Sequence, residues 1–228
     1  MATLDEIRSR STWGQVLEGQ PQHLILLTLL TVGALALLRE PPDQTGFGAT
    51  GWAKLSIALA ILHQLIVAVV FRLQLHRNVM TRLFGPRDMT VWAAIFLPLL
   101  AARPLTLILT GWADASQITG IRLPEILLGL ALLAPAAWAM QSTLTHFTLR
   151  RALGGDHFRE QIRKLPKVTG GVFDHTDNGM YGVVFLGLWA IALLFGSWNA
   201  LVVALFQHAY IWVHMYCTEA PDMRRLYG

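Results

Sequence analysis

Two polar clusters near the C-terminal end of the chain contain the residue types that bind cations and move protons. The first, residues 174–178, has two aspartates, a histidine and an asparagine directly before an apolar stretch. The second, residues 219–227, has a glutamate, an aspartate, two arginines and a tyrosine directly after the last apolar stretch. Carboxylates and imidazoles can bind a cationic group or accept a proton from it. We therefore expect the chemistry of the chain to reside in these two clusters.

The first cluster also has a purely structural interpretation. Asp177 or Asn178 would serve as the N-cap of a helix that starts near Met180. The same helix start offers unpaired N–H groups and the positive end of the helix dipole, which together bind anionic groups. The residues leave both interpretations open.

The composition indicates a membrane environment. The chain has 228 residues, of which 54% are hydrophobic and only 14% are charged, whereas soluble domains are about 25% charged. So few charged residues cannot coat a soluble core of this size. The single cysteine, Cys217, excludes an intrachain disulfide and a cysteine-rich metal site, and we predict no metal. The net charge of +4 comes from basic residues between apolar runs, which indicates membrane orientation rather than nucleic-acid binding.

Six apolar segments predict six transmembrane helices in an all-α bundle. About 20 apolar residues cross the hydrocarbon layer, with about 17 as the lower limit. The last apolar stretch, residues 180–216, is too long for one crossing, and Gly196-Ser197 is the sequence within it that favours a reversal. We therefore expect a tight helical hairpin there. The predicted spans are His23–Leu38, Ala53–Leu75, Val91–Thr110, Pro124–Phe147, Met180–Phe195 and Trp198–Tyr216.

The basic residues predict the orientation of the chain. Fourteen of the 18 lysines and arginines fall in the N-terminal segment, the two connections before residues 91 and 180, and the C-terminal tail. Cytoplasmic segments carry such an excess. We therefore expect both termini and the active site at the cytoplasmic face of a multi-pass protein, in a bacterial inner membrane or the endoplasmic reticulum. We interpret residues 1–228 as a single membrane domain, with a four-span part over 1–149 and a loop, hairpin and tail over 150–228.

The predicted hairpin determines where the two polar clusters lie. A two-residue turn brings together the cytoplasmic ends of the fifth and sixth spans. Residues 174–181 and 216–227 must then be neighbours at one membrane face. Topology alone predicts carboxylates, a histidine and tyrosines around one mouth, beside a basic connection.

The order of these segments resembles a known family. The string GGVFDHTDNGMYG, a helical hairpin and the string TEAPDMRRLYG are similar to the C-terminal half of integral membrane S-adenosylmethionine-dependent methyltransferases. This superfamily includes phosphatidylethanolamine N-methyltransferases and isoprenylcysteine carboxyl methyltransferases. Gly179 and Ala220 depart from the phospholipid enzymes, which have a proline and a second glutamate there, and Asn178 disfavours the isoprenylcysteine enzymes. The residues that match family elements are Leu153, Gly154, Phe158, Asp177, Asn178, Met180, Tyr181, Glu219, Pro221, Met223, Leu226, Tyr227 and Gly228.

The resemblance implies transfer of a methyl group from S-adenosylmethionine to a lipid-like acceptor, with the amine of phosphatidylethanolamine as the leading acceptor. It implies that Glu219 binds the ammonium of the donor and that backbone N–H groups around Gly179 bind its carboxylate. Tyr181 and Tyr227 would flank the adenosine or orient the donor. The predicted donor-binding residues are Asn178, Gly179, Met180, Tyr181, Gly182, His214, Glu219 and Tyr227. The proton acceptor is left open among His175, Asp174 and Glu219.

Two alternatives remain open. One is S- or O-methyl transfer to an isoprenoid or a small thiol or carboxylate. The other is a non-enzymatic transporter or subunit in which His63, Arg103 and His208 form a polar path, because polar residues within spans usually face the bundle interior. Interhelical hydrogen bonding is an equal explanation for His63 and Gln64. For Arg103, beside Pro104, we expect the side chain to extend to the membrane interface. The sequence does not predict an oligomeric state.

Overall fold

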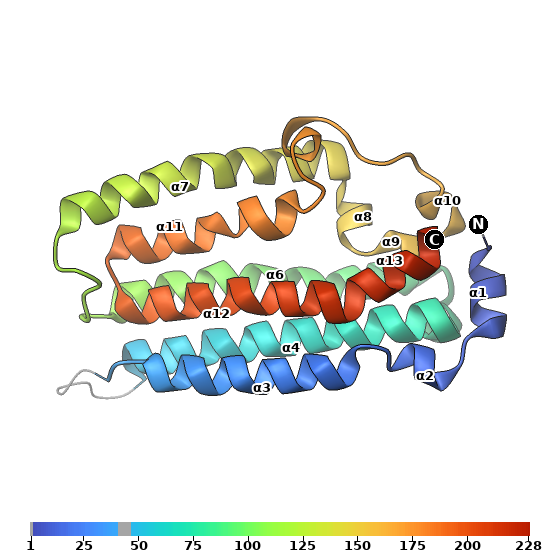
Figure 1. Ribbon diagram of the computed structural model, residues 1–228, viewed down its shortest axis with the longest axis horizontal. Coiled ribbons are helices and arrows are strands. Elements are labelled where there is room, and N and C mark those ends of the chain that lie inside the picture. Colours follow the sequence, from blue (N-terminus) through green and yellow to red (C-terminus); the bar gives the residue numbers. More distant parts are fainter. Residues whose placement is uncertain (1, 41–46) are drawn as a thin grey trace.

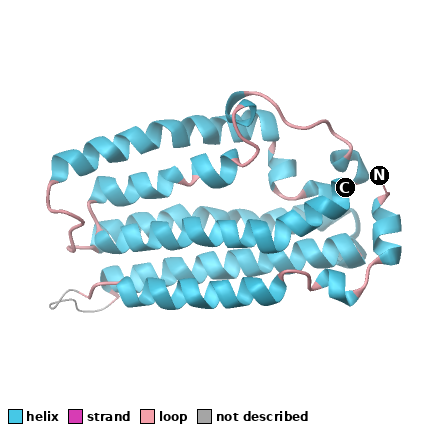
Figure 2. Ribbon diagram, in the orientation of Figure 1, coloured by secondary structure: helices cyan, strands magenta, loops and turns pink. Residues whose placement is uncertain are grey.

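The chain folds into long helices that run side by side (Figure 1, Figure 2). The computed structural model describes residues 2–40 and 47–228, and every element named in these ranges is helical. The long helices are α3 (Gln20–Leu37), α4 (Gly48–Arg77), α6 (Asp88–Ala113), α7 (Arg122–Ser142), α11 (Leu186–Phe195) and α12 (Trp198–His214). The short α-helices are α1 (Leu4–Arg10), α2 (Trp13–Val16), α5 (Val79–Phe84), α8 (Leu149–Ala152), α9 (Gly155–Phe158), α10 (Glu160–Arg163) and α13 (Ala220–Tyr227). 3₁₀ turns occur at Gly85–Arg87 and Gly171–Asp174, and π-helical turns at Thr143–Phe147, Met180–Val184 and Met215–Glu219.

Five helical segments are long and apolar enough to cross a membrane, which confirms the predicted all-α, polytopic membrane bundle. All six predicted spans are helical, but the fifth forms a shorter apolar helix over Met180–Phe195. A helix of that length crosses a bilayer only where the bilayer is locally thinned or flanking residues extend it. The five longer segments are Trp13–Leu37, Gly48–Arg77, Val79–Ala113, Arg122–Phe147 and Trp198–Tyr227.

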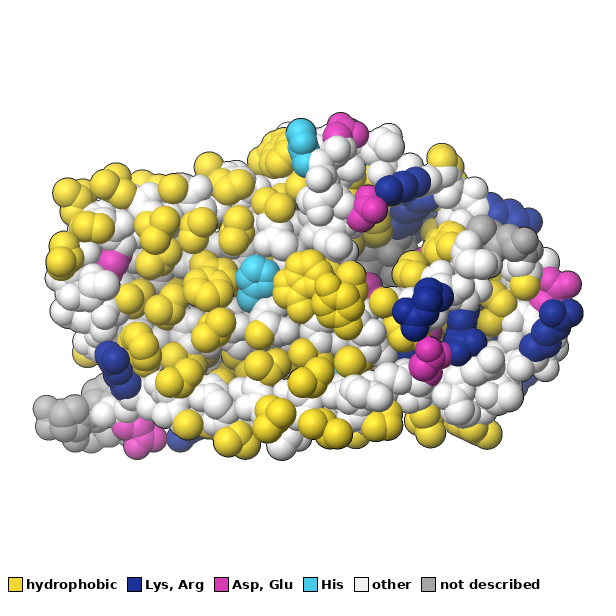
Figure 3. Space-filling model, in the orientation of Figure 1, with side chains coloured by type: hydrophobic (Ala, Val, Ile, Leu, Met, Phe, Trp, Pro, Cys, Tyr) yellow, Lys and Arg dark blue, Asp and Glu magenta, His cyan; other side chains and the backbone are white. Residues whose placement is uncertain are grey.

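The outer faces of the long helices are apolar. Large hydrophobic side chains are exposed along α3 and α7, and Figure 3 shows the hydrophobic residues spread over most of the visible face. A soluble protein rarely exposes contiguous apolar surface of this extent. The side chains therefore face lipid, and the polar groups lie inside the bundle.

The predicted hairpin between the last two spans is confirmed. Gly196 ends α11 with a left-handed φ of +66°, and Ser197 caps α12 by accepting a hydrogen bond from the Ala200 N–H at 2.9 Å. A Cβ at Gly196 would lie 1.9 Å from Nη1 of Arg122. The turn therefore requires glycine for both its backbone conformation and its close contact.

Both termini lie at one end of the bundle, together with the short helices α8 to α10 and α13 (Figure 1). Most of the charged side chains visible in Figure 3 gather at the same end. The structure thus brings the termini and the long basic connection to one end, as the sequence predicts. That this end faces the cytoplasm stays a prediction.

Candidate active site

A cavity of about 780 Å³ lies between the long helices and extends to the end of the bundle that carries both termini. Its volume is typical of small-molecule sites. Near that end, which we call the mouth, its charged and polar lining includes Arg151, Asp156, His157, Lys167, Asp177, Asn178, Tyr181, Glu219, Arg224 and Tyr227. The part that lies midway along α4 and α6, which we call the inner end, is lined by His63, Gln64, Phe96, Leu100, Arg103 and Phe185.

Three π-helical turns form walls of this cavity. Phe147 comes from the turn after α7, Tyr181 from the turn before α11, and Glu219 from the turn after α12. A π turn inserts a residue into the helix and redirects the side chains near it, and such turns are frequent at functional sites. The departures from regular helix therefore coincide with the cavity.

The turn that carries Glu219 is stabilised from a distant helix. Its carbonyl groups include those of Cys217 and Thr218, and Nη2 of Arg72 in α4 donates to both at 3.1 Å. Nη1 of Arg72 also pairs with Oδ1 of Asp222 at 2.9 Å, and both side chains are almost fully buried. Arg72 thus fixes the turn from which Glu219 projects, through two of its carbonyl groups and through Asp222.

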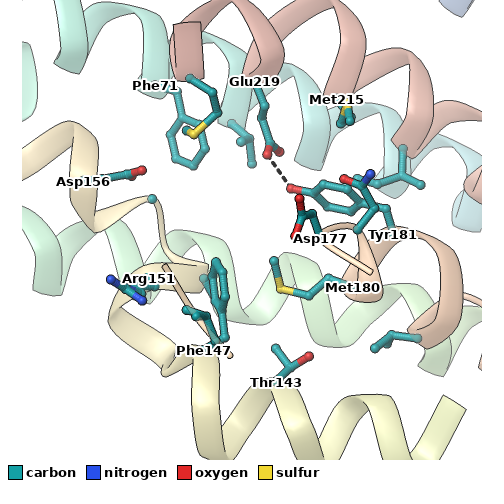
Figure 4. A pocket seen from close by; sticks show the side chains of 18 of the residues that line it. Phe71, Thr143, Phe147, Arg151, Asp156, Asp177, Met180, Tyr181, Met215 and Glu219 are labelled. Carbon is teal, nitrogen blue, oxygen red and sulfur yellow. Dashed lines mark hydrogen bonds between the residues drawn. The ribbon is translucent and has the colours of Figure 1, made fainter. Parts of the chain in front are cut away.

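Glu219 and Tyr181 meet across the two polar clusters. The Tyr181 hydroxyl donates a hydrogen bond to Oε2 of Glu219 (Figure 4). Oε1 of Glu219 lies 3.4 Å from Nε2 of His214, which is fully buried. The bond between Tyr181 and Glu219 confirms that residues 174–181 and 216–227 are neighbours. An ionised carboxylate accepts several hydrogen bonds, so Glu219 can still bind a cation in the cavity.

Asp156 faces the cavity from the opposite side (Figure 4). The Tyr227 hydroxyl donates to its Oδ2 at 3.1 Å, and Nδ1 of His157 lies 2.9 Å from its Oδ1. Burial acts to raise the pKa of Asp156, but the His157 cation and the hydrogen bonds from His157, Tyr227 and the backbone together outweigh it and hold that pKa below its usual value. Asp156 is therefore an anion at neutral pH.

His157 connects this wall to the buried charges behind it. Its Nε2 lies 3.3 Å from Oδ2 of Asp222, and its ring stacks on Phe71 with the centroids 4.4 Å apart. Burial alone would lower the pKa of His157, but the carboxylates of Asp156 and Asp222 reverse this effect and raise the pKa to about 10. The histidine is therefore a buried cation between two carboxylates.

The sequence analysis missed Asp156 and His157 as site residues. Both lie in the string ALGGDHF, from which only Leu153, Gly154 and Phe158 were used. A histidine directly after an aspartate was an available signal, but the second carboxylate, Asp222, is 65 residues away in the sequence. Only the fold joins them.

The structure brings together part of the predicted site. Five of the predicted donor-binding residues line the cavity, namely Asn178, Met180, Tyr181, Glu219 and Tyr227. Three of them do not line it, namely Gly179, Gly182 and His214. Among the predicted proton acceptors, only Glu219 lines the cavity, whereas Asp174 and His175 are exposed outside it. Asp174 accepts a hydrogen bond from the Gly170 N–H, and His175 contacts the ring of Trp138.

The predicted side-chain cap before Met180 is wrong. No side chain caps this turn, and the Asn178 carbonyl accepts the N–H groups of Tyr181 and Gly182. Asp177 instead pairs with Lys167 at 2.8 Å. The N–H groups of Tyr181 and Gly182 are therefore not free to bind a carboxylate.

Two expectations for the spans also change. Arg103 does not extend to the interface: it is 3% exposed and its Nε donates to Oε1 of Gln207 at 2.8 Å. The side chain turns inward because α12 offers it a buried acceptor. His208 does not line the cavity and accepts a hydrogen bond from Trp189. His63 and Arg103 therefore share the cavity without His208.

Comparisons with known proteins agree with the resemblance. Residues 124–228 match the phospholipid methyltransferase family. The chain is similar to a phosphatidylethanolamine N-methyltransferase of Scheffersomyces stipitis, with 32% identity over 74 residues, which are 32% of this chain and 9% of that protein. It is also similar to one of Malassezia globosa, with 33% identity over 121 residues, which are 52% of this chain and 12% of that protein. The chain thus spans about a tenth of the length of these relatives. No solved structure matches it.

Proposed function

We propose that this chain, whose residues 124–228 carry the phospholipid methyltransferase sequence, is a membrane-embedded enzyme that transfers a methyl group from S-adenosylmethionine to the amine of phosphatidylethanolamine. The observation that carries the proposal is the hydrogen bond between Tyr181 and Glu219. It joins two family-like segments on the wall of a cavity that a small molecule can enter. The names of the similar proteins support the choice of acceptor.

The mouth suits a cationic methyl donor. When bound, S-adenosylmethionine supplies a methyl group activated by a positively charged sulfur. Glu219 would hold its ammonium by charge-assisted hydrogen bonds. Tyr181 and Tyr227 would flank its adenosine, and the rings of Phe71 and Phe147 line the cavity nearby. Aromatic faces attract cations, so the lining favours a sulfonium without competing for its methyl group.

One wall of the cavity suits a lipid acceptor. Met140 and Leu144 line the cavity, yet they are 45% and 64% exposed on the outer side of the bundle. Side chains that face both the cavity and the lipid form a boundary that an acyl chain can occupy. This boundary favours a substrate that enters sideways from the bilayer over a water-soluble thiol or carboxylate.

The reaction depends mainly on position. The amine lone pair attacks the methyl carbon in line with sulfur, the carbon–sulfur bond breaks, and sulfur keeps the electron pair. Holding both partners in this alignment accounts for much of the rate acceleration of such a displacement. Asp156, opposite Glu219, would hold the amine in its protonated form before transfer. The amine must lose its proton before its lone pair can attack.

The proposal is tested with washed membranes that contain the protein and a methyl-labelled donor. Label should enter the phosphatidylethanolamine of an added lipid extract and produce its N-methyl derivative, and Glu219→Gln should abolish the incorporation. Asp174→Asn is the matched control, because it removes a carboxylate outside the cavity. Label in an isoprenoid or small-molecule fraction, with none in phospholipid, would overturn the choice of acceptor.

A further inference from the structure

We propose that Arg103 and His63 form an oxyanion-binding subsite at the inner end of the cavity. Its ligand is the carboxylate of the methyl donor or the phosphate of the acceptor lipid. The identity of these two ligands rests on the proposed function. The requirement for an anion at this place rests on the geometry of the side chains alone.

Arg103 is a buried cation without a counter-ion. Its side chain lines the cavity and is 3% exposed. Its Nε is bonded to Gln207, but its Nη2 is buried without a hydrogen-bond partner. In residues 2–40 and 47–228, no carboxylate forms an ion pair with it. An unpaired charge in the interior of a membrane protein is strongly unfavourable. A bound anion would remove that penalty.

His63 presents further unused hydrogen-bonding groups to the same space. It lines the cavity and is 2% exposed, and neither of its ring nitrogens has a partner. Among the polar side chains nearby, Gln207 and Thr106 both donate to Ser56, and Gln64 lines the same space. Arg103 Nη2 and the two ring nitrogens of His63 are the buried groups there that have no hydrogen-bond partner among the described residues.

The depth of Arg103 and His63 in the bundle distinguishes them from the basic groups at the mouth. His63 lies about 21 Å and Arg103 about 22 Å along its helix from the end of the bundle that carries the mouth, at about 1.5 Å per residue. The basic groups at the mouth are engaged: Arg151 donates to the Pro166 carbonyl, Lys167 pairs with Asp177, Arg224 pairs with Glu18, and His157 lies between Asp156 and Asp222. Among the described residues that line the cavity, Arg103 is therefore the buried cation without a carboxylate partner.

Both ligands of the proposed reaction carry an oxyanion close to a nitrogen. The Arg103 guanidinium lies 5.0 Å from the ring centroid of Phe185, which follows the π-helical turn that carries Tyr181. In the donor, the carboxylate is on the same carbon as the ammonium. In the lipid, two carbons separate the phosphate from the amine. Each ligand therefore carries an oxyanion of the kind that the buried Arg103 cation lacks.

A cycle of protein and ligand changes tests the proposal in the purified full-length protein. The donor arm compares the affinities of S-adenosylmethionine and its decarboxylated analogue. The lipid arm compares phosphatidylethanolamine with a long-chain amino alcohol that lacks phosphate. Each comparison is made in the wild type, in Arg103→Gln and in Arg103→Lys. Arg103→Gln keeps a polar side chain of moderate size and removes the charge, whereas Arg103→Lys keeps the charge.

We expect Arg103→Gln to lose about ten- to hundredfold in affinity for the ligand whose oxyanion binds there, and to leave the affinity for its oxyanion-free analogue unchanged. Loss in the donor arm assigns the carboxylate, and loss in the lipid arm assigns the phosphate. Arg103→Lys should retain part of the preference, and it replaces Arg103→Gln in the cycle if that variant does not fold. A preference for the oxyanion that is equal in wild type and variants overturns the subsite. A wild type that binds neither the donor nor the lipid overturns the proposed function instead.

Discussion

The mouth and the inner end of the cavity differ in whether their charged groups have partners. At the mouth, each carboxylate has a partner: Glu219 accepts from Tyr181, and Asp156 accepts from Tyr227 and contacts His157. At the inner end, Arg103 has an unpartnered nitrogen and no carboxylate beside it among the described residues. The carboxylates at the mouth are bonded to groups of the protein itself, whereas the Arg103 cation at the inner end has no counter-ion among the described residues.

This difference separates stability from ligand binding. A paired, buried charge contributes to the fold, and removing its partner is costly. An unpaired, buried charge reduces stability until a ligand neutralises it, so removing it should help the empty protein. The variants below test this contrast, from the largest expected effect to the smallest.

The largest effect should come from Asp222, which lies behind the mouth. Asp222→Asn removes the carboxylate that pairs with Arg72 and contacts His157. It leaves two buried cations undercompensated, and we expect a loss of about 3–5 kcal/mol in the free energy of unfolding. Denaturation in detergent measures this loss. Asp5→Asn is the control, because Asp5 is 95% exposed in its pair with Arg8 and should change stability by less than about 1 kcal/mol. Equal effects of the two substitutions would contradict the account.

The next effect should come from Glu219. Glu219→Gln keeps the size of the side chain and removes the charge that would bind the donor ammonium. We expect about a hundredfold weaker binding of S-adenosylhomocysteine by calorimetry, as for the loss of a charge-assisted contact in a shielded site. Tyr181→Phe should weaken binding less, because it removes only the hydroxyl that orients the carboxylate. Asp177→Asn, a control at the exposed rim, should bind within about threefold of wild type. If it weakens binding as much as Glu219→Gln, the mouth is a nonspecific acidic surface.

The third effect is a dependence of stability on pH. The pKa of His157 is about 10 in the fold and 6.5 when unperturbed. A raised pKa stabilises the folded state fully below about pH 6.5, and this contribution is lost as the pH rises through about 10. The melting temperature should therefore fall between pH 7 and pH 10. His157→Gln should have a lower melting temperature at pH 7 and a flatter profile over this range. A variant profile as steep as that of the wild type would show that other groups cause the decline.

The smallest effect should come from the inner end. In the ligand-free protein, Arg103→Gln should raise the melting temperature by about 2–4 °C, which corresponds to about 1 kcal/mol in a chain of this size. The sign is opposite to that of Asp222→Asn because this substitution removes an uncompensated charge. Scanning calorimetry of the empty protein measures it. A lower melting temperature would mean that Arg103 is a structural residue and that the contrast between the two ends is false.

Much of the fold could be predicted because its signals are local or follow from topology. Apolar run lengths indicated the helices, and Gly196-Ser197 marked the hairpin that the structure contains. The hairpin then required residues 174–181 and 216–227 to meet, and the bond between Tyr181 and Glu219 is where they do. These inferences need only the lengths of the apolar runs, the residues of the turn and the length of a crossing.

The site itself was only partly predictable, since residue type does not reveal direction. Asp174 and His175 have suitable chemistry but lie outside the cavity. Asp156 and His157 have it as well, and they enter the site because α9 packs beside α13. The π-helical turns that carry Tyr181 and Glu219 have no signature in the composition, yet they determine where those side chains point.

The sequence by itself determined that this is a helical membrane protein, where its last two helices reverse, and which two polar segments converge. Hydropathy and turn chemistry act over a few residues, so they can be inferred from the chain directly. Only the tertiary structure decided that Arg103 turns inward to Gln207 and that His157 lies between two aspartates. The direction of a side chain around its helix depends on which neighbours pack against it, and those neighbours are distant in the sequence.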